Sequence, residues 1–235
     1  MPVKPGDSEA VEQLFNDVAP RYDRLNDLLS LGLHRQWKRQ LLTWLRPATG
    51  ERWLDLCCGT GDLALALART VRPGGAVVGL DAAATPLEVA RERSAREPWL
   101  PVSWQHGDAL CTGLPAASFD GVVMAYGLRN LADARAGLAE MHRLLRPGGR
   151  AGVLDFNRLP AASWQASFQR LYLRRMVVPA ASLVGLQSQY AYLEDSLARF
   201  ATGAEQEAMA MDVGFRSARH RSLVAGQMGV LLLER

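Results

Sequence analysis

Acidic and glycine residues follow the predicted strands of this chain in a pattern that suits binding of a small charged molecule. The segment Asp55–Gly61 reads Asp-Leu-Cys-Cys-Gly-Thr-Gly and lies between an apolar segment and a helical one. Gly59 and Gly61 allow a tight turn and a close approach of the backbone to a ligand. The helix that follows points free backbone N–H groups toward the same place. The segment therefore predicts a ligand-binding turn at the start of a helix.

This turn fits two classes of cofactor. The spacing Gly59-x-Gly61-x-x-Ala64 satisfies the Gly-x-Gly-x-x-Gly/Ala pattern of dinucleotide sites, so a nicotinamide-dependent oxidoreductase is one hypothesis. An enzyme that uses S-adenosylmethionine is the other. A third interpretation has no ligand: the turn only joins a strand to a helix, and Asp55 and Asp81 are solvated strand ends.

Two aspartates favour S-adenosylmethionine, and a third suits either cofactor. Asp55 lies at the end of the first predicted strand, where a carboxylate would repel a pyrophosphate but attract the ammonium group of a methionine moiety. Asp81 ends the second strand and suits the ribose hydroxyls of either cofactor. Asp108 follows the third strand and suits an adenine amino group. We expect the donor site to comprise Asp55, Cys57, Gly59, Thr60, Gly61, Asp81, Asp108, Ala109 and Ala125.

Alternating strands and helices must position these residues. Short apolar strands are predicted at 52–56, 76–80, 101–106, 119–124 and 151–156, and helices at 61–70, 85–96 and 133–145. Such alternation predicts a parallel sheet with right-handed crossovers, covered on both faces. Strands at 217–224 and 228–234 predict a terminal antiparallel hairpin. The expected fold class is therefore α/β, a Rossmann-like class I methyltransferase fold with a seven-stranded, mostly parallel sheet.

The length suits one domain, 1–235. An apolar stripe of Leu33, Trp37, Leu41 and Leu45 supports a helical N-terminal segment. The spacing of Thr202 and Glu205 predicts a capping box at the start of the last helix. We expect four parts: an N-terminal helical segment at 10–46, a cofactor-binding core at 51–157, a helical insert at 160–200, and the last helix with the hairpin at 203–235.

The composition excludes several classes of protein. A formal net charge of +3 is too small an excess to indicate a nucleic-acid partner, but it is compatible with transient contact with an anionic membrane surface. The three cysteines form neither a disulfide framework nor a metal site, which indicates a reducing compartment. With no signal peptide and no run of about 18 apolar residues, we expect a cytoplasmic protein, at most peripheral to a membrane.

Several segments resemble the ubiquinone/menaquinone C-methyltransferase family over roughly residues 11–234. Its opening signature is similar to 14–38, which contains Asn16-Asp17-Val18-Ala19-Pro20-Arg21-Tyr22-Asp23, and its second signature to Tyr126-Gly127-Leu128-Arg129-Asn130. Residues 144–149 resemble a motif common to many methyltransferases. Within the family, segments 54–59, 154–157, 192–196 and 202–205 resemble most the cyanobacterial and plastid branch, which methylates reduced 2-phytyl-1,4-naphthoquinone in the last step toward phylloquinone.

The resemblance implies C-methylation of a prenylated naphthoquinol such as demethylphylloquinol, with demethylmenaquinol or a benzoquinol as alternative acceptors. It implies that Arg129 stabilises a ring oxyanion or holds a water that takes the proton, because a guanidinium is no base. Asn130 is a second catalytic candidate, although it also suits the N-cap of a helix at 131–145. The resemblance also implies that the segment 10–46 folds over the donor as a lid, with Tyr22 near the donor's sulfonium or carboxylate. The structural alternatives are a surface ion pair for Arg129 and a core position for Tyr22.

The insert 160–200 is rich in aromatic and aliphatic residues, and the resemblance makes it the candidate groove for the isoprenoid tail. Arg170, Arg174 and Arg175 flank it and could meet lipid headgroups. The alternative is a covering layer over the sheet with a solvated basic face. A non-catalytic scaffold that holds a quinone is the remaining functional hypothesis, and the sequence leaves the oligomeric state open.

Overall fold

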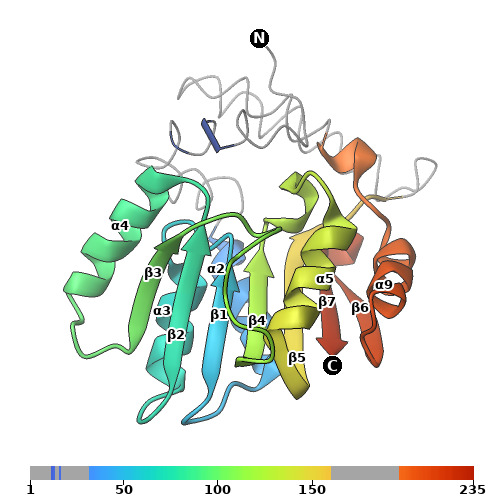
Figure 1. The fold of residues 1–235 in the computed structure, drawn as a ribbon. Helices are drawn as coiled ribbons and strands as arrows, with labels where there is room; N and C mark the ends of the chain where they lie inside the picture. Colours follow the sequence, from blue (N-terminus) through green and yellow to red (C-terminus); the bar gives the residue numbers. More distant parts are fainter. Residues whose placement is uncertain (1–11, 14–15, 17–31, 160–195) are drawn as a thin grey trace, which may run out of the picture.

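Seven strands form one mixed sheet in the order β3-β2-β1-β4-β5-β7-β6 (Figure 1). Strands β1 to β5 run parallel, and β7 pairs antiparallel with both β5 and β6. The predicted α/β fold with its terminal hairpin is thus confirmed. The strands are β1 (Arg52–Leu56), β2 (Ala76–Asp81), β3 (Val102–His106), β4 (Phe119–Ala125), β5 (Leu145–Phe156), β6 (Ser217–Leu223) and β7 (Met228–Glu234).

This computed structural model describes residues 12–13, 16, 32–159 and 196–235. Tyr22, most of the predicted lid at 10–46 and most of the predicted insert at 160–200 lie outside these residues, as do Arg170, Arg174 and Arg175. Within the described part of the chain, no helix is both long enough and apolar enough to cross a bilayer.

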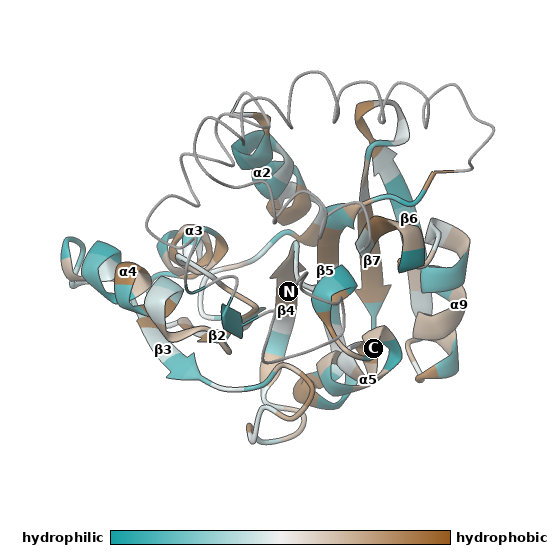
Figure 2. Ribbon diagram, turned by 90° about the horizontal axis from the view of Figure 1, so that it is seen from above, coloured by the Kyte–Doolittle hydropathy of each residue, from teal (hydrophilic) through white to brown (hydrophobic). Residues whose placement is uncertain are grey.

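Helices cover both faces of the sheet (Figure 2). Helices α2 (Leu33–Leu45), α3 (Asp62–Thr70) and α4 (Ala84–Ala95) lie on one face, and α5 (Ala134–Leu144) and α9 (Gly203–Asp212) lie on the other. Two short 3-10 turns are η1 (Leu128–Asn130) and η3 (Val224–Gly226). Because both faces are covered, the central strand residues Leu54, Leu56, Val122 and Val123 are fully buried.

Helix α2 is fixed closely on β5. A Cβ atom added to Gly152 of β5 would lie 2.6 Å from Leu41 Cδ1 and 2.8 Å from Leu45 Cδ1, so only a glycine lets the helix approach this far. Arg150 of β5 holds the end of the helix, because its guanidinium donates to the carbonyls of Leu45 and Arg46, the latter over 2.7 Å. These contacts determine which side of α2 faces the edge of the sheet.

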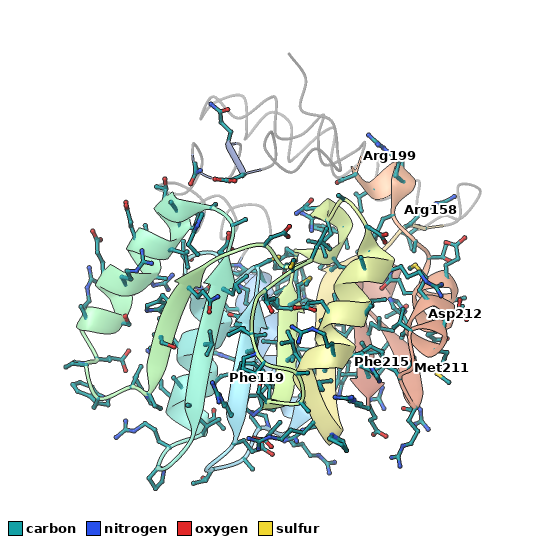
Figure 3. The ribbon with its side chains drawn as sticks, viewed as in Figure 1. Phe119, Arg158, Arg199, Met211, Asp212 and Phe215 are labelled. Atoms are coloured by element: carbon teal, nitrogen blue, oxygen red, sulfur yellow. The ribbon has the colours of Figure 1, made fainter. Side chains whose placement is uncertain are left out.

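Helix α9 begins at the predicted capping box, where Thr202 and Glu205 exchange side-chain and backbone hydrogen bonds. Phe215, just after the helix, lies between α9 and the sheet, whereas Met211 and Asp212 lie on the outward side (Figure 3). The edge of the His142 ring packs on Phe215, with the ring centroids 5.1 Å apart. This side of the sheet is therefore a packed core.

Two sequence predictions were wrong at element boundaries. The helix expected across 10–46 does not continue through Gly32, whose φ of 76° makes it the residue before α2, and Leu33 is 40% exposed instead of part of the buried stripe. Strand β5 begins at Leu145, six residues before the predicted start at 151, because Leu145 already pairs with Phe119. The pairing register shifts between Phe119 and Gly121, which absorbs the extra residues.

Candidate active site

A cleft opens where β1, β2 and β4 end. Leu56 pairs with both Leu80 and Met124, so these strands bring their carboxyl ends to one edge of the sheet. Ligands of open α/β sheets bind at this edge. The lining residues are Glu12, Lys38, Asp55, Cys57, Cys58, Gly59, Thr60, Leu63, Leu80, Asp81, Ala82, Ala83, Pro86, Asp108, Ala109, Leu110, Ala125, Tyr126, Gly127, Asn130, Leu131 and Ala132.

The glycine turn joins β1 to α3 as predicted. The backbone N–H of Cys58 donates to the Leu80 carbonyl over 3.1 Å, and the N–H of Gly59 donates to Asp81 Oδ2 over 2.7 Å, so the turn is tied to the neighbouring strand. Helix α3 follows Gly61 without a side-chain cap. In the first turn of α3, the N–H of Ala64 donates to the buried Asp55 instead of a residue of the turn.

Gly61 does not line the cleft, although it was predicted to contact the donor. Its φ is 85°, and an added Cβ atom would lie 2.4 Å from Trp104 of β3 and 3.2 Å from Ala90 of α4. A close approach of the turn to these residues therefore explains this glycine. At Gly59, by contrast, an added Cβ atom would meet no protein atom within 4 Å.

Asp55 lies beneath the glycine turn and is 1% exposed. Its Oδ2 accepts from the backbone N–H of Ala64 in α3 over 2.9 Å. Burial raises the pKa of this carboxyl to about 8, against the opposing effects of the Lys38 ammonium and the Ala64 N–H. A cationic ligand in the cleft would stabilise the charged form of Asp55.

Asp81 and Asp108 face the cleft from the ends of β2 and β3. Burial raises the pKa of Asp81, partly countered by backbone N–H donors. The two oxygens of Asp81 accept from Gly59 and, over 2.9 Å, from Ala83, which fixes the orientation of the carboxylate. Asp108 Oδ1 accepts from the N–H of Leu110 over 2.8 Å. Both carboxylates retain acceptor capacity, since each oxygen has two lone pairs.

Glu12 and Lys38 line the cleft and were missed from sequence. Helical periodicity places Lys38 off the apolar stripe of α2, but it does not tell whether that side faces solvent or a ligand. The Lys38 ammonium lies 3.0 Å from Asp62 Oδ2, and Asp62 Oδ1 accepts from Arg93 over 2.7 Å. Arg93 also donates to the carbonyl and hydroxyl oxygens of Thr60. This chain of polar contacts links α2, α3 and α4 across the glycine turn.

Arg129 and Asn130 follow β4 in η1, and only Asn130 lines the cleft. The guanidinium of Arg129 forms an ion pair with Asp155 at the end of β5, in which both side chains are less than a tenth exposed. The Tyr126 carbonyl accepts from Arg129 Nη1 over 3.1 Å and from Asn130 Nδ2 over 2.9 Å. The surface ion pair considered for Arg129 is thus a buried one.

Asn130 is not the N-cap of the helix after it, and that prediction was wrong. Asp133 has this role, because its Oδ1 accepts from the N–H of Ala136 over 3.0 Å. Asn130 instead lies within η1 and is 8% exposed. Its side-chain amide donates to the carbonyl of Tyr126, four residues earlier.

The two adjacent cysteines occupy different places. Both line the cleft, but Cys58 is buried, whereas Cys57 is half-buried and adopts a φ of 56°. A Cβ atom on Gly127 would lie 2.8 Å from Cys57 Cβ, so the loop after β4 packs directly on the glycine turn. Burial raises the pKa of both thiols, which keeps them protonated.

The charges of the cleft fit a cationic cofactor. Among the described lining residues, the four carboxyl groups of Glu12, Asp55, Asp81 and Asp108 outnumber the one ammonium of Lys38. Such a surface attracts a sulfonium and an ammonium and repels a pyrophosphate. Of the donor residues predicted from sequence, all but Gly61 lie on this surface.

Comparison with known proteins agrees with this site. The model of the ubiE/COQ5 methyltransferase family matches residues 4–232. A 2-phytyl-1,4-naphthoquinone methyltransferase of Nostoc punctiforme is 46% identical over 96% of this chain and 98% of its own length. The chloroplastic 2-phytyl-1,4-β-naphthoquinone methyltransferase of Arabidopsis thaliana is 42% identical over 94% of this chain and 86% of its own.

A solved structure shares the fold at low sequence identity. Phosphoethanolamine N-methyltransferase 2 of Haemonchus contortus, in complex with S-adenosyl-L-methionine, is 17% identical and superposes with a TM-score of 0.66. The match covers 94% of this chain and 60% of the other. The shared fold extends over the strands and helices that form the cleft.

Proposed function

Because this chain belongs to the ubiE/COQ5 methyltransferase family, we propose that it methylates a ring carbon of a prenylated naphthoquinol, with reduced 2-phytyl-1,4-naphthoquinone as the acceptor. It is an S-adenosylmethionine-dependent methyltransferase. The acidic cleft at the glycine turn carries the donor part of the proposal. The similarity to naphthoquinone methyltransferases along almost the whole chain supports the acceptor part.

The donor would lie along the ends of β1, β2 and β3. Asp55 would accept from its ammonium group, Asp81 from the ribose hydroxyls and Asp108 from the adenine amino group. Cys57, Gly59, Thr60, Ala109 and Ala125 would form the walls between them. When bound, S-adenosylmethionine supplies an electrophilic methyl group on a sulfonium.

The acceptor chemistry needs one proton removed and negative charge stabilised. A naphthoquinol that loses a hydroxyl proton carries nucleophilic density on the adjacent ring carbon. That carbon gains the methyl group and loses its hydrogen as a proton, which restores the aromatic ring, and the ring oxygen regains a proton. One proton is therefore released in total. The cleft would hold the ring beside the donor and exclude water.

Arg129 would stabilise the ring oxyanion, and Asp155 would hold it in position. The pair lies at the carboxyl ends of β4 and β5, directly beside Asn130 in the cleft wall. A cation held in place at this edge favours the deprotonated quinol, because no protein group has to move when the negative charge develops. Asn130, which holds the Tyr126 carbonyl, would shape the wall against which the ring lies.

The segments at 10–46 and 160–200 would complete the site. We propose that the first covers the donor, with Tyr22 near the sulfonium, and that the second holds the phytyl tail. Arg158 and Arg199, which flank the second segment, are exposed at the same end of the molecule as the cleft (Figure 3). This placement supports peripheral contact of that end with an anionic membrane, from which the acceptor would enter.

Methyl transfer from deuterated S-adenosylmethionine tests the proposal. The purified chain is offered reduced 2-phytyl-1,4-naphthoquinone, its oxidised form, and a benzoquinol with the same phytyl tail. We expect the labelled methyl group on the naphthoquinol ring, as read by mass spectrometry, and little on the other two. Transfer to the benzoquinol alone would overturn the acceptor, and binding of NADH without binding of S-adenosylmethionine would overturn the donor.

A further inference from the structure

Lys38 enters the cleft from α2, outside the parallel-sheet core. Its side chain is 17% exposed, and its ammonium lies 3.0 Å from Asp62 Oδ2 and 6.0 Å from the centroid of the Tyr126 ring. An ammonium has three hydrogens to donate, and Asp62 takes one. A ligand in the cleft can accept from another.

The position of Lys38 is fixed on both sides. Gly152 and Arg150 of β5 hold α2 against the sheet, and Arg93 shares the Asp62 carboxylate from α4. Although burial pushes the pKa of Asp62 up, Lys38 and Arg93 together hold it below its ordinary value, so the carboxylate stays charged. Arg39, the neighbour of Lys38 on α2, is exposed. Lys38 is therefore distinct from the solvated basic face of α2.

The charge balance of the cleft leaves one group of the donor without a counter-charge. The donor carries a sulfonium, an ammonium and a carboxylate. The four carboxylates of the described cleft suit the two cations, but they would repel the carboxylate. Among the described residues that line the cleft, Lys38 is the one lysine or arginine, and its ion pair with Asp62 places its ammonium beside the first turn of α3.

We propose that Lys38 binds the carboxylate of the donor's methionine moiety, opposite Asp55, which takes the ammonium. Asp62 and Arg93 position the lysine and are not ligands themselves. The cleft would thus recognise the amino-acid end of the donor by both of its charges. This inference rests on the donor part of the proposed function and is independent of the acceptor.

Binding calorimetry with two donors separates this role from a structural one. The probes are S-adenosylmethionine and decarboxylated S-adenosylmethionine, measured with the full chain and the variants Lys38→Met, Lys38→Arg and Arg39→Met. Loss of a charge-assisted hydrogen bond should shift the ratio of the two Kd values in Lys38→Met by about 10- to 100-fold toward the decarboxylated donor. Lys38→Arg should restore part of the shift, and Arg39→Met should leave the ratio within about 2-fold.

A distorted glycine turn would weaken both donors alike and leave their ratio unchanged. A folded Lys38→Met variant that keeps the wild-type ratio overturns the assignment, even if both Kd values rise. If the wild-type chain does not bind S-adenosylmethionine, the donor part of the proposed function fails as well. If the wild type binds the donor but Lys38→Met does not change the ratio of the two Kd values, the proposed function stands and this inference fails.

Discussion

Arg129 and Asp155 form a buried ion pair that joins the turn after β4 to the end of β5. The guanidinium contacts one carboxylate oxygen, and the backbone N–H of Arg129 donates to the other over 3.2 Å. The same guanidinium donates to the Tyr126 carbonyl, in a residue whose φ of 62° is unfavourable for a tyrosine. The pair therefore holds a strained segment of the cleft wall in place.

Asp155→Ala should destabilise the protein strongly, because it leaves the Arg129 guanidinium buried without its counter-charge. Removal of one partner of a buried pair costs about 3–5 kcal/mol, which lowers Tm by roughly 6–20 °C in a chain of this size. Thermal unfolding followed by circular dichroism measures this. The matched control is Glu234→Gln, which breaks the exposed pair with Arg216 and should cost less than about 1 kcal/mol. Equal effects of the two substitutions would contradict the burial argument.

Arg129→Met should lower kcat about 100-fold or more, because a preorganised cation near a developing oxyanion contributes on this scale. The donor affinity should change little, since Arg129 pairs with Asp155 at the ends of β4 and β5, whereas the donor would lie along the ends of β1, β2 and β3. Steady-state kinetics with calorimetry of S-adenosylmethionine binding separates the two effects. Arg129→Lys keeps the charge and should recover part of kcat. A folded Arg129→Met variant with wild-type kcat would show that the residue is structural only.

Asp55→Asn should remove a pH dependence from the stability of the donor-free protein. The folded pKa of about 8 lies above the unfolded value near 4, so the folded state binds more protons between these two pH values. The titration of Asp55 should therefore lower the free energy of unfolding of the wild type as pH rises from about 4 to about 8. This contribution should be absent in Asp55→Asn. Parallel thermal melts at pH 5 and pH 8 measure the difference, which should exceed about 3 °C. The variant should also bind S-adenosylmethionine more weakly, although its stability at pH 8 is higher. Identical pH profiles would exclude an elevated pKa.

The two glycines of the turn should respond differently to alanine. Gly61→Ala places a Cβ atom 2.4 Å from Trp104 at a φ of 85°, so it should lower the free energy of unfolding by about 2 kcal/mol or more. Gly59→Ala meets no protein atom and should cost only about 1 kcal/mol for its φ of 54°, but it should weaken donor binding. Urea unfolding and donor calorimetry on both variants test this contrast. A Gly59→Ala variant with unchanged donor affinity would mean that the donor does not approach this turn.

The fold and the acidic strand ends of the cleft could be predicted from the sequence for a specific reason. Strand ends such as Asp55, Asp81 and Asp108 could be placed because parallel strands bring their carboxyl ends to one edge, whatever their order. Lys38 could not, since its role depends on how Gly152 and Arg150 dock α2 on β5, which no local pattern encodes. Tertiary contacts likewise decided the roles of neighbouring residues.

Asn130 illustrates this limit. Its residue type suits an N-cap, yet Asp133 three residues later caps α5 and leaves Asn130 to hold the Tyr126 carbonyl. The sequence around Arg129 fits both a surface residue and a site residue, and its burial against Asp155 rules out the surface position. Local chemistry predicts what a side chain can do, and the three-dimensional fold selects among those possibilities.

The quinone pool of the host tests the central claim most directly. Deletion of the gene for this chain, followed by mass spectrometry of extracted quinones, should reveal a prenylated naphthoquinone that lacks one methyl group, and a plasmid copy should restore the methylated form. An intact naphthoquinone pool together with an undermethylated benzoquinone would contradict a naphthoquinol acceptor.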